Sequence, residues 1–258
     1  MDSIEKFLAN DEYNLREVSA RLPYFTELMP QIHSLYSRAI ELVPQAAEAQ
    51  GVLFSESLLL CHKGFLCSAA TIARRHPDDA ASISRRTIEV ASLAVAVKSD
   101  PGNFERWQAG EARMRRWAER RAGKKPRPFY PDVKYPENPR LEKLRSYLGV
   151  LSDGFVHYTP EFAAGQNWEK VKQGDGGYLQ LPYLTTDQAA IEHQCLLLGT
   201  IHIRILDLLG ECFDGLFAKD KEWATIRKDV GDRLAALATS YAAAHPTVEQ
   251  ERPAEEQK

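Results

Sequence analysis

Two arginines and one glutamate interrupt an otherwise apolar stretch of the chain. The segment SISRRTIEVASLAVAV, Ser82 to Val97, carries Arg85, Arg86 and Glu89. On a helix, Arg85 lies four residues and Arg86 three residues before Glu89, so either guanidinium can meet the carboxylate. Because residues 90–97 are almost wholly apolar and a lone buried carboxylate is costly, we expect Arg85 to neutralise Glu89 within a central helix. Such a pair leaves guanidinium donors for a ligand anion.

Further polar side chains follow a predicted amphipathic helix. Ser152 and His157 lie in LSDGFVHYTPEF, at the end of that helix and beside a proline. A histidine at a helix end titrates near neutral pH and can donate, accept or ligate. We therefore expect a pocket in which Arg85, Glu89 and His157, with Arg86 and Ser152 beside them, hold an anionic group such as a phosphate. Two alternatives stay open: the ion pair can be purely architectural, and His157 can be a capping or packing residue.

A basic segment offers a second candidate surface. Between Arg113 and Lys143 there are eleven Lys or Arg residues and four acidic residues, a local charge of +7 in a chain of net charge −3. Trp117, Phe129 and Tyr130 are interleaved with these cations, a mixture that nucleic-acid sites use. The alternative is a solvated helix face followed by a surface loop. The candidate RNA-contacting residues are Arg115, Arg116, Arg120, Arg121, Lys124 and Lys125.

Other chemistries find no matching spacing. The four cysteines are scattered without metal-type spacing, which favours buried reduced thiols in a cytoplasmic protein. Glu192, His193 and His202 do not lie on adjacent turns of one face, so we interpret these histidines as core or cap residues. No paired Glu-x-x-His motif, P-loop, nucleophile elbow or dinucleotide motif occurs, and we predict no metal and no cofactor. The N-terminus lacks an apolar signal core, and we expect no membrane span.

Helical spacing dominates the chain and predicts an all-α fold. Predicted helices cover about residues 24–43, 55–75, 78–98, 101–121, 140–157, 185–217 and 221–244. The expected architecture is one domain, residues 1–244, built as a bundle of six or seven helices. Partial alternation around a glycine-rich turn predicts a small extended or hairpin insertion near residues 165–184. The polar tail, residues 245–258, is predicted to be disordered.

These motifs together resemble a family of helical bacterial proteins of unknown function. The resemblance covers about Leu59 to Glu161 and lies in an Arg-x(2–3)-Glu helix, an Asp-Pro break, a Trp-bearing charged helix and a later Tyr..Leu-Ser...His segment. Here these features are Arg85 or Arg86 with Glu89, Asp100-Pro101, Trp107 and Trp117, and Tyr147, Leu151, Ser152 and His157. The resemblance implies an all-helical fold in which Arg, Glu and His converge.

The chain is also distantly similar to helical domains of the HEPN type, some of which are metal-independent ribonucleases. Those enzymes use an arginine followed four to six residues later by a histidine. This chain has no such motif, since Arg74-Arg75-His76 is too closely set and Arg145 lies too far from His157. The departure puts that ribonuclease chemistry in doubt and leaves phosphate binding open.

Three functions are therefore compatible with the sequence. The first is a binding or regulatory module whose pocket holds a phosphate-bearing ligand or RNA. The second is a hydrolase of nucleic acid or nucleotide, in which Arg85 or Arg86 stabilises phosphoryl charge and His157 acts as acid or base. The third is a partner-binding bundle whose ion pair is architectural. Composition does not determine the oligomeric state or the ligand.

Overall fold

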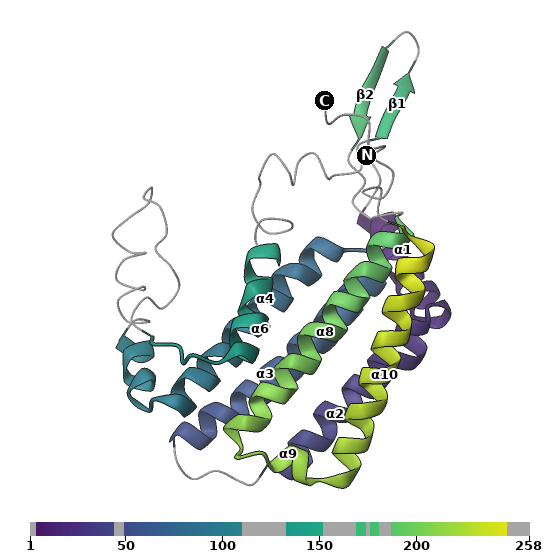
Figure 1. The fold of residues 1–258 in the computed structure, drawn as a ribbon. Coiled ribbons are helices and arrows are strands. Elements are labelled where there is room, and N and C mark those ends of the chain that lie inside the picture. The colour runs from purple at the N-terminus through teal and green to yellow at the C-terminus, as the bar shows by residue number, and fades with distance from the viewer. Residues whose placement is uncertain are drawn as a thin grey trace, which may run out of the picture.

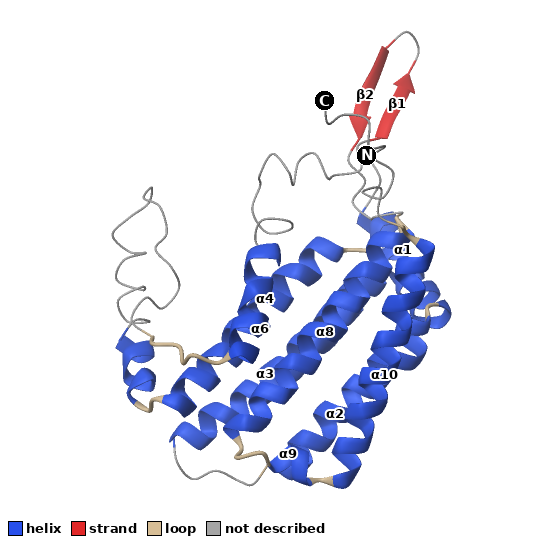
Figure 2. Ribbon diagram, in the orientation of Figure 1, coloured by secondary structure: helices blue, strands red, loops and turns tan. Residues whose placement is uncertain are grey.

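Helices form almost all of the regular structure. A computed structural model describes residues 4–43, 49–109, 133–151, 169–173, 176–180 and 187–246. Figure 2 shows these residues as packed helices with one pair of strands. The elements are, in chain order, α1 (Ile4–Arg21), the π-helix η1 (Tyr24–Leu28), α2 (Met29–Leu42), α3 (Ala49–Ala73), α4 (Pro77–Ser99), α6 (Pro139–Leu151), β1 (Glu169–Gln173), β2 (Gly176–Gln180), α8 (Gln188–Cys212), α9 (Leu216–Lys219) and α10 (Lys221–Ala244). The predicted all-α fold is confirmed.

Helix α8 is the centre of the bundle. Fifteen of its 25 residues are buried, and they cover most of its circumference, so it must be surrounded by other helices. Figure 1 shows α8 between α10 on one side and the pair α3 and α4 on the other. Contacts along its length show that α2 and α4 run parallel to α8, whereas α3, α6 and α10 run antiparallel to it.

Helices α3 and α4 form an antiparallel pair joined by a tight turn. The turn places Arg75 in the left-handed region, with φ of 69°, and the amide of His76 donates to the carbonyl of Thr71. These bonds satisfy the last carbonyls of α3. Pro77 then occupies the first turn of α4, where its missing N–H costs nothing. His76 is the N-cap residue of α4, and Asp78 and Asp79 lie in its first turn.

The N-terminal helices pack one apolar stripe against α8. Leu28, Ile32, Leu35 and Ala39 are buried as their spacing predicts. Pro30 lies at the start of α2, directly after the π-helix η1, which agrees with its predicted role as a helix start or kink. Helix α1 was not predicted, and only one of its residues is buried, Val18.

A left-handed pair of residues ends α8 earlier than the sequence suggests. We expected one helix over residues 185–217, but α8 stops at Cys212, and Asp214 and Gly215 have φ of 54° and 72°. The amide of Gly215 donates to the carbonyl of Gly210, which closes the helix end. The chain can therefore reverse, and α10 returns along α8. At the other end, Asp187 is the N-cap residue and accepts from the amide of Ala190.

A buried asparagine joins the chain across the end of α4. The side-chain nitrogen of Asn103 donates to the carbonyls of Ala96 and Lys134, at 2.8 and 2.7 Å. Its side-chain oxygen accepts from the amide of Lys134 and from Arg106, at 2.9 and 2.6 Å. All hydrogen-bonding positions of this fully buried amide are thus used, and the segment that leads to α6 is fixed against the end of α4.

Several predictions fall partly outside the described residues. Strands β1 and β2 pair antiparallel, with Glu169 opposite Gln180, but the residues around them are not described, so the insertion near 165–184 stays a prediction. The same holds for the count of six or seven helices, the single domain over residues 1–244 and the disordered tail, since residues 247–258 lie outside this part. Among the described helices, Gly51–Ala73 is long and apolar enough to cross a membrane by length and composition, and 44% of that window is buried inside the protein.

Candidate functional site

The predicted pair of Arg85 and Glu89 is present at the edge of α4. The Nε atom of Arg85 lies 3.4 Å from Oε1 of Glu89, and their side chains are 30% and 24% exposed. The pair is therefore half-buried, whereas we expected it to be enclosed within a central helix. Arg86 is exposed, and no described contact joins it to Glu89. The neighbouring part of α4, from Ala91 to Val97, is buried as predicted.

Tyr135 and Arg145 complete the polar surroundings of this pair. The guanidinium of Arg145 lies 3.8 Å from the ring centroid of Tyr135, a cation–π contact. Burial raises the pKa of the Tyr135 phenol, Arg145 lowers it, and the nearby carboxylate of Glu89 raises it. Glu89 therefore faces α6 and the segment before it.

The remaining predicted site residues lie outside the described part of the chain. They are Ser152 and His157 in the polar pocket and Arg115, Arg116, Arg120, Arg121, Lys124 and Lys125 in the basic segment. Convergence of Arg85, Glu89 and His157 thus stays a prediction, as does the RNA surface.

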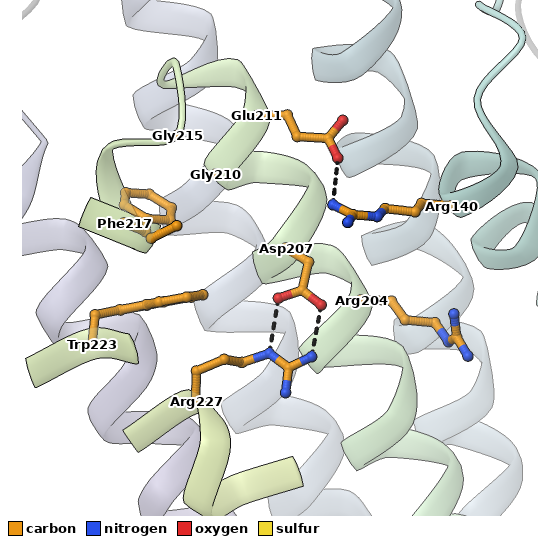
Figure 3. Close-up of a pocket in the computed structure, with 10 residues that line it drawn as sticks. Arg140, Arg204, Asp207, Gly210, Glu211, Gly215, Phe217, Trp223 and Arg227 are labelled. Atoms are coloured by element: carbon orange, nitrogen blue, oxygen red, sulfur yellow. Dashed lines mark hydrogen bonds and ion pairs between the residues drawn. The ribbon is translucent and has the colours of Figure 1, made fainter. Parts of the chain in front are cut away.

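A different pocket lies where α6, α8 and α10 meet. It has a volume of about 460 Å³, within the range of small-molecule sites. Its walls carry three arginines, two carboxylates and two aromatic rings (Figure 3). The lining residues are Arg140, Arg204, Asp207, Gly210, Glu211, Gly215, Phe217, Ala218, Trp223 and Arg227.

Helix α8 supplies the charged wall of this pocket. Arg204, Asp207 and Glu211 follow one another at spacings of three and four residues, so they share one face of the helix. Figure 3 shows Arg227 reaching Asp207 from α10 and Arg140 reaching Glu211 from α6. The charged lining residues sum to +1, so the pocket favours an anion.

The pair of Asp207 and Arg227 is bidentate and partly buried. Nε and Nη2 of Arg227 donate to the two carboxylate oxygens at 2.8 and 2.7 Å, and the side chains are 28% and 29% exposed. The hydrogen bond to Asp207 raises the pKa of the Arg227 guanidinium, which stays charged. Arg140 and Glu211 form a more exposed pair at 2.9 Å, at the rim.

Two buried N–H donors in this pocket have no acceptor. They are Nε of Arg204 and Nε1 of Trp223, and Trp223 is only 4% exposed. A buried donor without a partner costs about 1–3 kcal/mol, so such donors in folded proteins usually meet water, an ion or a ligand. Both residues line the pocket, and Figure 3 shows them on opposite sides of Asp207. Each of the two nitrogens is itself closed off from solvent, so they are separate unsatisfied groups in the pocket walls.

The turn after α8 and the start of α10 fix the aromatic wall. A Cβ atom at Gly210 would come within 3.3 Å of the Phe217 ring, so glycine lets this ring pack against α8. The rings of Phe217 and Trp223 lie 5.8 Å apart. Asp220 caps α10 by accepting from the amide of Trp223 at 2.8 Å, and Arg38 of α2 lowers the pKa of this carboxyl through its hydrogen bond. Trp223 is thus held by both backbone and packing.

Sequence reasoning missed this pocket although part of its signal was visible. Arg204, Asp207 and Glu211 form a charged column on an otherwise apolar helix, and Trp223 and Arg227 lie one turn apart on α10. Among the polar residues considered on this helix, His202 lies on a different face, whereas Glu192 and His193 lie near the N-terminal end of α8, away from the pocket. His202 is buried against Tyr36, whereas His193 is exposed.

Metal ligands and thiols do not form a second site in this part of the chain. The described residues contain no group of three or more His, Cys, Asp or Glu side chains placed to hold a metal ion. All four cysteines are free; Cys61, Cys195 and Cys212 are buried as expected, and Cys67 is exposed.

Comparison with protein-family models, curated proteins and solved structures found no match to this chain. The resemblance to HEPN-type domains therefore has no support beyond the all-helical fold. Any functional conclusion depends on the geometry of the pocket.

Proposed function

We propose that this protein is an anion-binding helical module whose site is the pocket between α6, α8 and α10. The observation that carries the proposal is the arginine-rich lining, in which Arg204 makes no ion pair among the described residues. An anionic ligand would supply the opposite charge that this guanidinium lacks. A phosphate group suits the site because arginine presents fixed N–H donors to its oxygens.

Binding suits this pocket better than hydrolysis. In the part of the chain that the structure describes, its lining residues include no histidine, serine, threonine, cysteine, lysine or tyrosine, and both carboxylates are already paired with arginines. General acid–base or nucleophilic catalysis needs a group of one of these kinds free to act. The hydrolase hypothesis involved His157 and a different set of residues, and it stays a prediction.

Calorimetry with pyrophosphate tests the proposal. Titrations of the full chain, at constant ionic strength, compare the unaltered protein with Arg204→Gln and Trp223→Phe. We expect about tenfold weaker binding for Arg204→Gln, because one charge-assisted hydrogen bond contributes about 1.5–3 kcal/mol in isolation and part of this is lost to solvent screening. Trp223→Phe keeps a ring and removes an N–H that is closed off from solvent, so it should change the affinity by less than about twofold.

Arg16→Gln is the control for the loss of one positive charge. Arg16 lies in α1 in an exposed pair with Glu12, away from the pocket. Its loss should leave pyrophosphate affinity unchanged. Equal weakening by Arg204→Gln and Arg16→Gln would mean a non-specific effect of net charge. No measurable binding by the unaltered protein would refute the proposal.

A further inference from the structure

Helix α3 carries an exposed apolar stripe on the side away from α8. Val52, Leu59, Leu60 and Leu66 are 42%, 52%, 49% and 44% exposed, although most large apolar side chains of the described helices are buried. At 100° per residue these four side chains lie within about a third of the helix circumference. A patch of this kind on a folded protein marks an interaction site more often than a neutral surface.

Two charged residues lie within the same stripe. Glu56 and Lys63 are exposed, are seven residues apart and occupy the middle of its width. Neither makes an ion pair among the contacts of the described residues, and neither has a charged neighbour three or four positions away in α3. Their charges therefore have no partner within their own helix.

The stripe is complementary to itself when two copies lie antiparallel. Glu56 and Lys63 are equally far from the midpoint between Leu59 and Leu60. A two-fold axis through that midpoint places Glu56 of one copy at the height of Lys63 of the other, twice by symmetry. The same axis brings the leucine pairs of the two copies together and sets Val52 within one residue of the height of Leu66 in the other copy. We propose that α3 mediates an antiparallel homodimer through the stripe Val52, Glu56, Leu59, Leu60, Lys63 and Leu66.

A second copy fits this surface better than a lipid bilayer. In a bilayer, Glu56 and Lys63 would each lose water without gaining an opposite charge. Nearly half of the apolar window of α3, 44%, is already buried against other helices of the protein. The dimer instead gives each charge an opposite charge in the other copy, within the apolar contact. A contact made by one helix from each copy is small, so we expect dissociation in the micromolar range.

Charge exchange tests the pairing directly. Sedimentation velocity of the full chain, at about 1–200 µM, should show a monomer–dimer equilibrium. Glu56→Lys and Lys63→Glu each place like charges opposite one another at two positions, and each should weaken the dimer at least about tenfold. The double exchange restores opposite charges and should restore the dimer. Because no neighbour in α3 is charged, neither change alters an ion pair within the helix, and circular dichroism checks that the fold is retained.

Disulfide trapping tests the register. In a Cys67→Ser background, Leu60→Cys lies beside the two-fold axis and should cross-link to its own copy under mild oxidation. The natural Cys67 should not, because in this register the two copies of Cys67 lie roughly 22 Å apart along the helices, whereas a disulfide requires Cα atoms within about 7 Å.

Three results would overturn the proposal. The first is a protein that stays monomeric at every concentration. If this monomer also floats with phosphatidylcholine vesicles, the stripe binds a membrane surface instead. The second is a dimer that is insensitive to both single charge changes. The third is cross-linking of Cys67 in place of Leu60→Cys, which would indicate a parallel pair.

Discussion

Replacing Asp207 with asparagine should change stability and anion affinity in opposite directions. Asp207 accepts two hydrogen bonds from Arg227 and neutralises it within the pocket. Asparagine keeps the shape and one acceptor but removes the charge. We expect the free energy of unfolding to fall by about 1–2 kcal/mol, because a charge-assisted bidentate pair becomes a neutral one at a site open to some solvent. The melting temperature should fall by about 2–8 °C for a chain of this size.

The same substitution should strengthen pyrophosphate binding. An anion about 7 Å from the Asp207 carboxylate is repelled by about 2 kcal/mol at an effective dielectric constant of about 20, and salt reduces this to about 1 kcal/mol. Its removal, which also frees Arg227, should raise the affinity about fivefold. Calorimetry and thermal denaturation of the same samples measure both effects. An Asp207→Asn protein that is less stable and binds pyrophosphate no better would refute the electrostatic reasoning.

A change of pH and two glycine substitutions probe the packing of the helices. Burial, with a smaller contribution from His62, lowers the pKa of His202 from 6.5 to about 3. The unfolded chain therefore binds a proton that the native state excludes, and the free energy of unfolding should fall by about 1.4 kcal/mol for each pH unit below about 6.5. Urea denaturation at about pH 7 and about pH 5 measures this slope, which His202→Gln should reduce; an unchanged slope would contradict the assignment. At Gly64, an added Cβ atom would overlap the hydroxyl of buried Thr87, so Gly64→Ala should destabilise the protein by about 1–3 kcal/mol. Gly149→Ala in α6, where an added Cβ atom meets nothing within 4 Å, should instead stabilise the protein by about 0.5–1 kcal/mol. If Gly64→Ala and Gly149→Ala shift the melting temperature equally, helix propensity and not steric overlap determines the effect at both positions.

The sequence predicted those features that depend on neighbours within one helix. The bounds of α10 and the pairing of Arg85 with Glu89 both follow from spacings of three or four residues. Helix α1 was missed because its side chains form no buried stripe, and Val18 alone of its residues is buried.

The pocket could be predicted only in part, because its walls come from three helices. The charged column on α8 and the pair of Trp223 and Arg227 on α10 are each visible as helical spacings. Their meeting requires α10 to run back along α8, which depends on the left-handed conformations of Asp214 and Gly215. The side chain of Arg140 arrives from α6, about 60 residues earlier in the chain than Arg204. No local pattern specifies that long-range contact.

The four hydrogen bonds of Asn103 also determine how the bundle responds to a change in the length of the chain between α4 and α6. One buried amide holds together two points of the backbone that are 31 residues apart in sequence. The entropy cost of closing that loop grows only slowly with its length. A change in the length of the chain between the two anchored points therefore adds little entropic cost and leaves the constraint on the end of α4 and on the segment before α6 unchanged.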